Sequence, residues 1–284
     1  MKIKITTDSV ADLNNEIYEK YDIGVLPLYV RLGDNEYKDG VNITTNDIYS
    51  YVAETNKLPK TAAISALEYQ EKFEEYLQSG YDAIVHISLS NEMSVTHNNA
   101  KTASEQIKNV YVVNSKSLST GVGLLVLYAC ELRDAGLSAQ EIVNKLEERV
   151  PFVQASFILD KLNYLHKGGR CSSVALLGAN LLKIKPNIEV KDGKMGVSKK
   201  YIGKFDKSLP NYINDTLAKF NNYDTKRVFV THTKIDQKYV DMAKEILRNN
   251  TNFEEIIETT AGSTITSHCG ENTIGILYFN NKVD

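Results

Sequence analysis

The sequence lacks several patterns that mark common classes of protein. It has three cysteines in 284 residues, widely spaced and with no C-x-x-C pair: Cys130, Cys171 and Cys269. An odd number of distant cysteines argues against a disulfide framework or a zinc knuckle. The longest apolar stretch, GVGLLVLYACEL, is too short to span a bilayer, and the N-terminus lacks the apolar core of a signal peptide. We therefore expect a cytoplasmic protein with free thiols and no stable membrane insertion.

The sequence also lacks a large excess of charge of either sign. The chain has 33 basic and 36 acidic side chains, for a formal net charge of −3. This balance gives no reason to expect a nucleic-acid partner. With 42% hydrophobic and 24% charged residues, the composition is typical of a globular protein long enough for one large or two medium domains.

The first half of the sequence alternates predicted strands and helices. We expect strands at 2–7, 24–32, 82–89 and 109–115. We expect helices at 11–21, 46–55, 66–80 and 98–107, and two more that begin near 123 and 138. NEYKDG is predicted to be a turn, and Thr45 to cap the helix that follows it. Such alternation predicts crossover connections and a mainly parallel sheet.

The pattern changes after Pro151. A strand at 152–159 and helices around Leu162 and Leu176 are followed by a hairpin, in which Ile188 and Val190 face Met195 and Val197 across Asp192-Gly193. A helix at 212–220, a strand at 227–232, a helix from Asp236 and strands at 253–259 and 272–279 complete the pattern. The fold class predicted is α/β, with a mainly parallel lobe at 1–151 and a lobe with a mixed or antiparallel sheet at 152–284.

A serine hydrolase is one chemical hypothesis, with Ser9 or Ser94 as the nucleophile and His268 as its base. The chain has no G-x-S-x-G elbow to mark a strained, exposed serine. Asp8, Ser9 and Asp12 are more simply explained as turn and N-cap residues at a strand-to-helix junction.

Metal and nucleotide motifs are absent from the sequence. The five histidines have no two-ligand helical spacing, and H-E-x-x-H does not occur. Cys269 is not a useful partner for His268, because neighbours on an extended chain point to opposite faces. TGVGLL has neither a third glycine nor a Walker lysine, so its glycines indicate close helix packing and no ATP site.

Hydroxyl side chains near predicted strand ends are the remaining candidates. Thr61 precedes a predicted helix, Ser94 follows the strand at 82–89, and a hydroxyl-rich run precedes His268. Open α/β sheets bind ligands at the carboxyl ends of their strands. Hydroxyls, helix amides and an imidazole can hold a carboxylate together. Thr61 and Ser94 can equally be helix caps, and both interpretations stay open here.

Four segments together resemble one family. TTDSVADL, LDKLNYLHKGGRCSS, LLKIKPNIEVKDGK and HCGENTIGI resemble, in order, motifs of the DegV family of fatty-acid-binding proteins. The matches extend over essentially the whole chain. The resemblance implies two α/β lobes with a lipid bound between them.

The resemblance also implies roles for particular residues. Thr61, Ser94 and His268 would surround the carboxylate of a long-chain fatty acid whose acyl chain runs into an apolar tunnel. A separate fatty-acid kinase catalytic subunit would convert that carboxylate to an acyl phosphate for phospholipid synthesis, and Arg170 lies in the region that meets it. The protein would then be no enzyme itself, with no catalytic residue, no metal and no cofactor other than the bound fatty acid.

The sequence departs from the family pattern at five positions. Ala62 replaces a serine, Val95 a glycine that lets backbone approach a ligand, and Glu271 a proline. Ile202 and Lys204 replace the two arginines of V-R-T-R, and lysine lacks the bidentate fork of arginine. The first three bear on headgroup preference. Ile202 counts against pairing with the kinase, although Lys204 leaves a basic group for docking.

Two other functions remain as alternatives. One is an acyl hydrolase or transferase that uses Ser94 and His268. The other is a carbonyl-binding subunit similar to that of dihydroxyacetone kinase, which has a related fold and uses a histidine as a covalent anchor.

Overall fold

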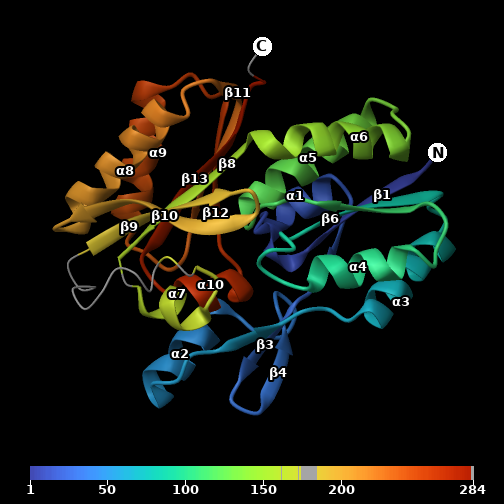
Figure 1. The fold of residues 1–284 in the computed structure, drawn as a ribbon, viewed down its shortest axis with the longest axis horizontal. Helices are drawn as coiled ribbons and strands as arrows, with labels where there is room; N and C mark the ends of the chain where they lie inside the picture. The colour runs from blue at the N-terminus through green and yellow to red at the C-terminus, as the bar shows by residue number, and fades with distance from the viewer. Residues whose placement is uncertain (161, 172, 174–183, 283–284) are drawn as a thin grey trace.

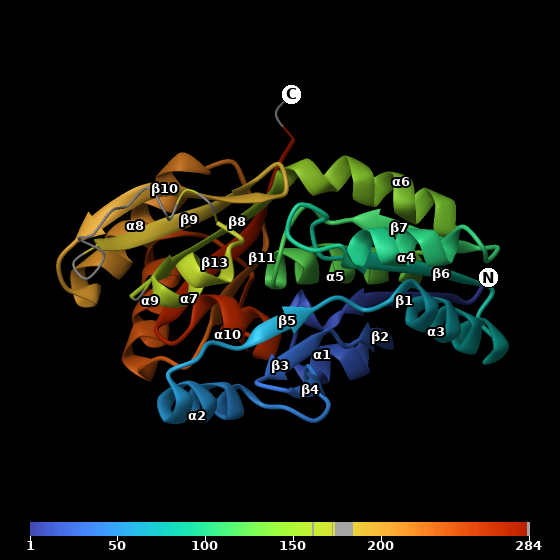
Figure 2. The ribbon, with the colours of Figure 1, turned by 60° about the horizontal axis from the view of Figure 1, so that its bottom comes forward.

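The structure, a computed structural model, describes residues 1–160, 162–171, 173 and 184–282. Within these residues the strands form sheets of four, six and three strands. Figures 1 and 2 show the two larger sheets side by side, with the small sheet below them in Figure 1. The α/β class and its division into a parallel and a mixed sheet are as predicted.

The four-stranded sheet is entirely parallel, in the order β2-β1-β6-β7. Every residue of β1 and β6 is buried, as expected for central parallel strands covered on both faces. Its strands are β1 (Ile3–Asp8), β2 (Ile23–Leu26), β6 (Ala83–Ser88) and β7 (Val110–Asn114). Its helices are α1 (Asn15–Lys20), α3 (Ala66–Gln78), α4 (Thr96–Ser104), α5 (Thr120–Asp134) and α6 (Ala139–Arg149), with 3₁₀ turns η1 (Ser9–Ala11) and η2 (Val150–Phe152).

The small antiparallel sheet was not predicted. It consists of β3 (Tyr29–Leu32), β4 (Asn35–Lys38) and β5 (Lys60–Ala62) in the order β4-β3-β5. The strand expected at 24–32 is split in two around Pro27, which has no N–H to donate to a ladder. The turn predicted at NEYKDG was wrong, because the chain reverses earlier, at Gly33, whose φ is 64°.

Helix α2 (Thr45–Thr55) begins one residue earlier than predicted, at Thr45. Thr44, and not Thr45, is the N-cap: its hydroxyl accepts from the Asp47 N–H, while the Asp47 carboxylate accepts from the Thr44 N–H at 2.8 Å. This reciprocal capping box satisfies two backbone donors that the helix itself cannot.

The six-stranded sheet has the order β10-β9-β8-β13-β11-β12, and only its β11–β12 pair is parallel. The predicted hairpin is confirmed, with Met195 opposite Val190 and Val197 opposite Ile188. Its strands are β8 (Val153–Leu159), β9 (Ile184–Lys191), β10 (Lys194–Ile202), β11 (Tyr223–His232), β12 (Glu255–Thr260) and β13 (Thr273–Asn280). The helices of this half are α7 (Asn163–Gly168), α8 (Phe205–Lys219), α9 (Gln237–Asn250) and α10 (Ser263–Cys269). The helix predicted around Leu176 lies outside the described residues.

Helix α5 lies between the two larger sheets. One buried cluster combines Ile5 and Val85 of the parallel sheet, Leu125 of α5, and Leu277 and Phe279 of β13. Helices α8 and α9 cover the opposite face of the six-stranded sheet (Figure 1). The two halves therefore share part of their core, and a lobe boundary near 151 stays a prediction.

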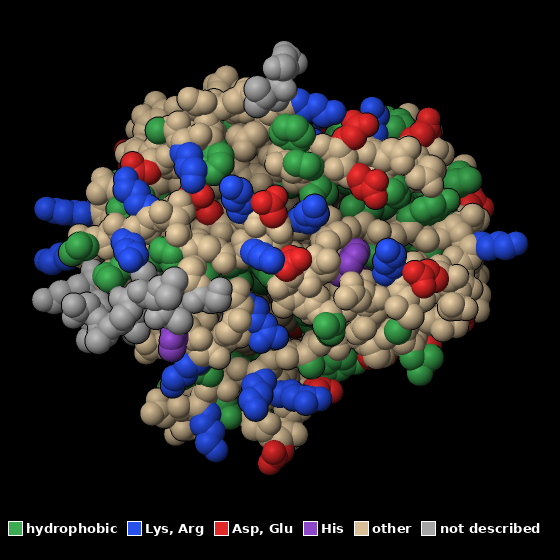
Figure 3. All heavy atoms as spheres, in the orientation of Figure 1, with side chains coloured by type: hydrophobic (Ala, Val, Ile, Leu, Met, Phe, Trp, Pro, Cys, Tyr) green, Lys and Arg blue, Asp and Glu red, His purple; other side chains and the backbone are tan. Residues whose placement is uncertain are grey.

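The surface mixes charges of both signs. On the face drawn in Figure 3, Lys and Arg side chains are spread among Asp and Glu side chains over both halves of the molecule. None of the helices in the described part is long and apolar enough to cross a membrane.

Candidate functional site

A cavity of about 450 Å³ opens at the carboxyl ends of strands β1 and β6. The turn after β1, the loop after β6, strand β5 and helix α10 all contribute to it. Most of its lining is apolar: Val10, Leu28, Ala62, Ala63, Leu89, Met93, Val95, Leu118, Met195 and Ile265. Leu118, Ile265 and Cys269 also line a further chamber of about 30 Å³ together with Phe157 and Leu277.

Thr61, Ser94 and His268, the three residues expected to bind a carboxylate, all line this cavity. Thr61 Oγ1 lies 2.9 Å from His268 Nε2, a contact between β5 and α10 across 207 sequence positions. Thr61 is therefore part of a strand and not a helix cap. These side chains give a mostly apolar cavity part of its polar surface, to which Asn91, Glu92, Arg170 and Thr264 also contribute.

The imidazole of His268 is held by close packing on its other side. Its Nδ1 is buried and has no hydrogen-bond partner among the described residues. A side chain at Gly168 would place its Cβ 2.6 Å from Nδ1, so only glycine lets α7 approach this closely. Burial, and to a lesser degree the Arg170 guanidinium, lower the pKa of His268 to about 4. The imidazole is accordingly neutral at pH 7.

Ser94 lines the cavity and is not the N-cap of α4, which is Val95. The Ser94 Oγ accepts the Thr96 N–H at 3.2 Å at the start of that helix. Because a hydroxyl also has a proton to donate, this bond leaves the Ser94 proton free for another acceptor.

Arg170 also lines the cavity, whereas Lys204 does not. The Arg170 side chain is exposed, and its Nη1 donates to the Gly168 carbonyl at 2.9 Å. Lys204 is exposed at the N-cap of α8, next to Gly203 and the 81% exposed Ile202. Of the two expected docking residues, only Arg170 therefore adjoins the cavity.

The other departures from the family pattern have simple structural settings. Ala62 lines the cavity with a methyl group. Val95 has an ordinary φ of −73°, so its position does not require glycine, and its side chain is 61% exposed. Glu271 does not belong to the lining, and its carboxylate lies 3.4 Å from Lys234 Nζ.

Two local predictions at this site were wrong. The chain around His268 is helical and not extended, so His268 and Cys269 do not point to opposite faces of a strand. Both residues line the cavity. Burial raises the pKa of the Cys269 thiol to about 12, which keeps it protonated. Asp8 caps no helix: its carboxylate accepts from the Tyr69 hydroxyl and from the Leu89 N–H.

Ser9 and Asp12 also differ from the predicted caps. The Ser9 hydroxyl donates to Asp39 at 3.0 Å and accepts from the Leu28 N–H at 3.1 Å. Asp12 accepts from the Ser119 hydroxyl and the Gly262 N–H. All of these partners are distant in sequence, so no local pattern could have identified them.

Sequence reasoning also missed Thr264, on the first turn of α10. Its side chain lines the cavity, and its buried Oγ1 has no hydrogen-bond partner among the described residues. The only signal was its place in the hydroxyl-rich run before His268.

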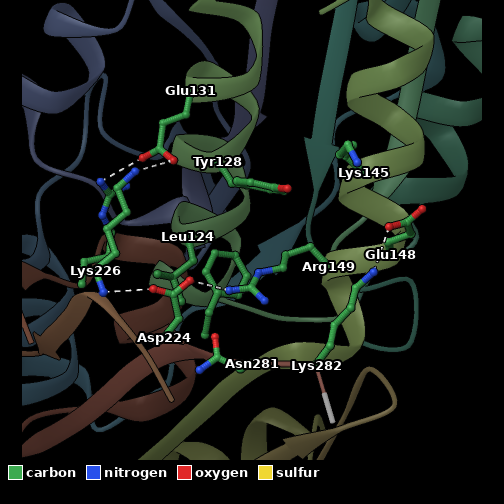
Figure 4. A pocket seen from close by; sticks show the side chains of 12 residues that line it. Leu124, Tyr128, Glu131, Lys145, Glu148, Arg149, Asp224, Lys226, Asn281 and Lys282 are labelled. Carbon is green, nitrogen blue, oxygen red and sulfur yellow. Dashed lines mark hydrogen bonds and ion pairs between the residues drawn. The ribbon is translucent and has the colours of Figure 1, made fainter. Parts of the chain in front are cut away.

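A second cavity, of about 440 Å³, lies between α5, α6 and the ends of β11 and β13 (Figure 4). Its charged lining residues are Lys145, Arg149, Lys226, Arg227, Lys282, Glu131, Glu148 and Asp224. Ion pairs join many of them, including Arg149–Asp224 at 2.6 Å and Lys226–Glu131 at 2.8 Å. Its walls are therefore suited to ions and water, and the first cavity is the candidate for an apolar ligand.

No group of three or more His, Cys, Asp or Glu side chains is placed to hold a metal ion within residues 1–160, 162–171, 173 and 184–282. Cys130, Cys171 and Cys269 are all free and buried.

The fold defines an α/β protein with a parallel and a mixed sheet, a small third sheet, and a largely apolar cavity. A family model described as an uncharacterised protein of the DegV family matches residues 2–281. The chain belongs to the DegV family. A DegV domain-containing protein of Clostridium acetobutylicum is 32% identical over 279 residues, 98% of each chain.

Solved structures of similar sequence have the same fold. A DegV family protein from Thermus thermophilus, described by its fatty-acid binding, has a TM-score of 0.88 at 27% identity, over 99% of this chain and 100% of that chain. A stearic-acid-binding protein from Eubacterium ventriosum has a TM-score of 0.86 at 26% identity, over 98% of both chains.

Proposed function

We propose that this protein binds a long-chain fatty acid in the 450 Å³ cavity, with the carboxylate at Thr61, Ser94 and His268. The observation that carries the proposal is a mostly apolar cavity wall in which Thr61 and His268 are in hydrogen-bond contact and to which Ser94 also belongs. The structural relatives from Thermus thermophilus and Eubacterium ventriosum support it, since each is described as binding a fatty acid.

Neutral donors are enough to hold the carboxylate. A neutral imidazole has one N–H, and a proton on Nε2 of His268 lets it donate to Thr61 Oγ1 at 2.9 Å. The Thr61 hydroxyl proton is then free for a carboxylate oxygen. Ser94 has its proton free in the same way, because its oxygen already accepts the Thr96 N–H. His268 therefore acts mainly by orienting Thr61.

The apolar lining provides the affinity. Burial of an acyl chain contributes roughly 0.8 kcal/mol per methylene, so ~14 methylenes contribute on the order of 11 kcal/mol before the cost of association. Hydrogen bonds to the carboxylate then determine which end of the chain faces the cavity mouth.

The finer part of the proposal is a carrier that presents the carboxylate to a separate fatty-acid kinase catalytic subunit. The exposed guanidinium of Arg170 at the cavity supports it, and Lys204 provides a second cation near the exposed Ile202. Phosphoryl transfer depends mainly on positioning and on charge stabilisation, so ATP and its metal can belong to the partner. Such a carrier would act in the cytoplasm and supply acyl phosphate for phospholipid synthesis.

The enzyme alternatives receive less support from this geometry. His268 Nε2 faces Thr61 and not Ser94, and Nδ1 has no carboxylate partner among the described residues. A triad needs both contacts. The small-carbonyl alternative needs an accessible imidazole nitrogen as nucleophile, but Nε2 is hydrogen-bonded and Nδ1 is buried against Gly168. Turnover of a chromogenic ester that Ser94→Ala abolishes would favour the hydrolase.

The direct test is mass spectrometry of the organic extract of the purified protein, followed by stearate binding to variants. We expect a stoichiometric long-chain fatty acid, and an affinity about tenfold lower in Thr61→Val and in His268→Ala, from the loss of one hydrogen-bond network. The double variant should lose little more than either single one. Thr55→Val removes an exposed hydroxyl that donates to the Tyr51 carbonyl and accepts from the Lys57 N–H, both outside the cavity lining, and serves as the control. An empty extract, together with no stearate binding, would refute the proposal.

A further inference from the structure

Helix α10, which contributes His268 to the cavity, is too short to be stable alone. It has seven residues, Ser263–Cys269, and isolated helices shorter than about 12 residues are marginal in water. Its first turn must be fixed by contacts from elsewhere, since the first N–H groups of a helix have no partner within it.

The carboxyl groups of Asp12 and Asp39, both in the N-terminal part of the chain, accept those N–H groups. Burial raises the pKa of Asp12 to about 8, so its carboxyl group is mostly protonated at pH 7. Asp12 Oδ1 accepts from Gly262 at 2.8 Å. Asp39 accepts from Ser263 at 2.9 Å with Oδ1 and from Thr264 at 3.1 Å with Oδ2. The partners are more than 200 positions apart in sequence, so these bonds tie α10 to the parallel and small sheets.

Both carboxyl groups are themselves fixed and buried. Asp12 is 5% exposed and accepts from the Ser119 hydroxyl, and Asp39 is 3% exposed and accepts from the Ser9 hydroxyl at 3.0 Å. The Asp39 N–H donates to the Leu28 carbonyl at 2.9 Å. Burying two carboxyl groups this close together costs free energy unless hydrogen bonds compensate. The hydrogen bonds that these two groups accept from α10 provide part of this compensation.

The C-terminal end of α10 is also held in place, by close packing. Gly270 follows the helix with a φ of 69°, and a Cβ there would lie 2.5 Å from the Tyr164 ring. The imidazole of His268 lies against Gly168 on the same side. Helix α7 therefore limits how far the C-terminal end can move, and the carboxyl groups set the position of the N-terminal end.

We propose that Asp12 and Asp39 are positioning residues for the polar part of the cavity wall, holding α10 so that His268 Nε2 meets Thr61 Oγ1. The part of this inference that concerns ligand affinity rests on the proposed function. The motif TTDSVADL thereby gains a physical role: Ser9 orients Asp39, Asp12 binds α10 directly, and neither residue lines the cavity.

The test compares Asp39→Ala and Asp39→Asn with a control that loses the same kind of bond elsewhere. Asparagine keeps one oxygen and can accept from Ser263 or Thr264 but not from both. Asp236→Ala is the control, because Asp236 caps α9 through the Lys238 N–H at 3.1 Å and lies outside the cavity lining. Gly262→Ala is a further variant, since its Cβ would lie 3.2 Å from Asp12 Oδ1 and 3.4 Å from Asp39 Oδ1.

Two measurements separate positioning from general destabilisation. In the ligand-free protein, an NMR titration should give His268 a pKa of about 4 in the wild type and a value nearer the ordinary ~6.5 in Asp39→Ala. Stearate affinity should fall about tenfold in Asp39→Ala, less in Asp39→Asn, and not at all in Asp236→Ala. If Asp39→Ala does not fold, Asp39→Asn and Gly262→Ala provide the same two measurements.

The possible outcomes are distinguishable. An unchanged His268 titration in folded Asp39→Ala, or in Asp39→Asn and Gly262→Ala, would overturn the positioning role. Equal losses of affinity in Asp236→Ala and Asp39→Ala would also overturn it, because the effect would then be one of stability alone. If the wild type binds no stearate but the His268 titration still shifts in Asp39→Ala, the proposed function fails and the positioning role is supported.

Discussion

Two of the molecule's cavities have nearly equal volumes and different walls. The one near α10 measures about 450 Å³ and is lined mainly by aliphatic side chains and methionines, with hydroxyls, one imidazole and two charged residues, Glu92 and Arg170. The one between α5 and α6 measures about 440 Å³ and has eight charged residues in its lining (Figure 4). Volume alone does not distinguish them as ligand sites.

The difference lies in what each cavity does to water. An apolar chain that entered the charged cavity would displace water from ammonium, guanidinium and carboxylate groups, which costs several kcal/mol per ion. In the apolar cavity the same chain displaces water from surfaces that bind it weakly, so burial is favourable. The wall chemistry, and not the size, selects the ligand class.

The largest effect is expected when the apolar cavity is made to resemble the charged one. Ile265 lines both the main cavity and the smaller chamber. Ile265→Glu should weaken stearate binding about 100-fold or more, because the acyl chain would have to bury a carboxylate. Ile265→Leu, which conserves volume, should bind normally, as should Tyr128→Glu in the charged cavity. Undiminished binding by a folded Ile265→Glu protein would place the acyl chain elsewhere.

A smaller effect is expected on the pH dependence of stability, to which His268 in the apolar cavity contributes and Lys145 in the charged cavity does not. Between pH 6.5 and about 4 the unfolded imidazole binds a proton that the folded one does not. The contribution of His268 to stability should therefore fall as the pH falls through this range, whereas buried Asp12, whose pKa is raised to about 8, contributes in the opposite direction in wild type and variant alike. Urea unfolding of the wild type should lose on the order of 1–3 kcal/mol more than that of His268→Gln between pH 7 and pH 4. Lys145→Gln, in the charged cavity, should keep the wild-type pH dependence. If the free energy of unfolding changed equally with pH in the wild type and in His268→Gln, the imidazole of His268 would not be buried and neutral.

The smallest effect is expected from the ion pairs of the charged cavity. Lys282 and Glu148 lie 2.9 Å apart, but their side chains are 57% and 56% exposed. Such pairs contribute little, so Lys282→Ala should change the free energy of unfolding by about 0.5 kcal/mol or less. Stearate binding should not change. A loss above about 2 kcal/mol, or any loss of stearate affinity, would show that this cavity is coupled to the other one.

Sequence patterns predicted the larger elements because these depend on local information. The buried runs that became β1 and β6 and the hairpin at Asp192-Gly193 each contain their own signal, of apolar residues or turn residues. The small sheet was missed because its strands are short and partly exposed, and NEYKDG resembles a turn. Helix α10 was missed because seven residues rich in Ser and Thr have no helical pattern, and distant carboxyl groups hold its first turn.

In the candidate site too, some residues could be predicted from local sequence and others could not. Thr61, Ser94 and His268 were identified from hydroxyls at predicted strand ends and from a family resemblance, and all three line one cavity. Asp39 was not identified, because it lay in a segment expected to be a simple turn. Its partners follow more than 220 positions later, and no pattern within one segment could relate them.

The Thr61–His268 contact, which joins positions 207 residues apart, has a consequence for protein synthesis. A growing chain folds from its N-terminal part first, so the parallel sheet can be buried before α10 has left the ribosome. The polar part of the cavity wall is then among the last features to assemble. A chain interrupted before residue 263 would lack His268 and also Leu277 and Phe279 of the shared core. It would have no place for a carboxylate, so binding competence would report that translation had passed α10.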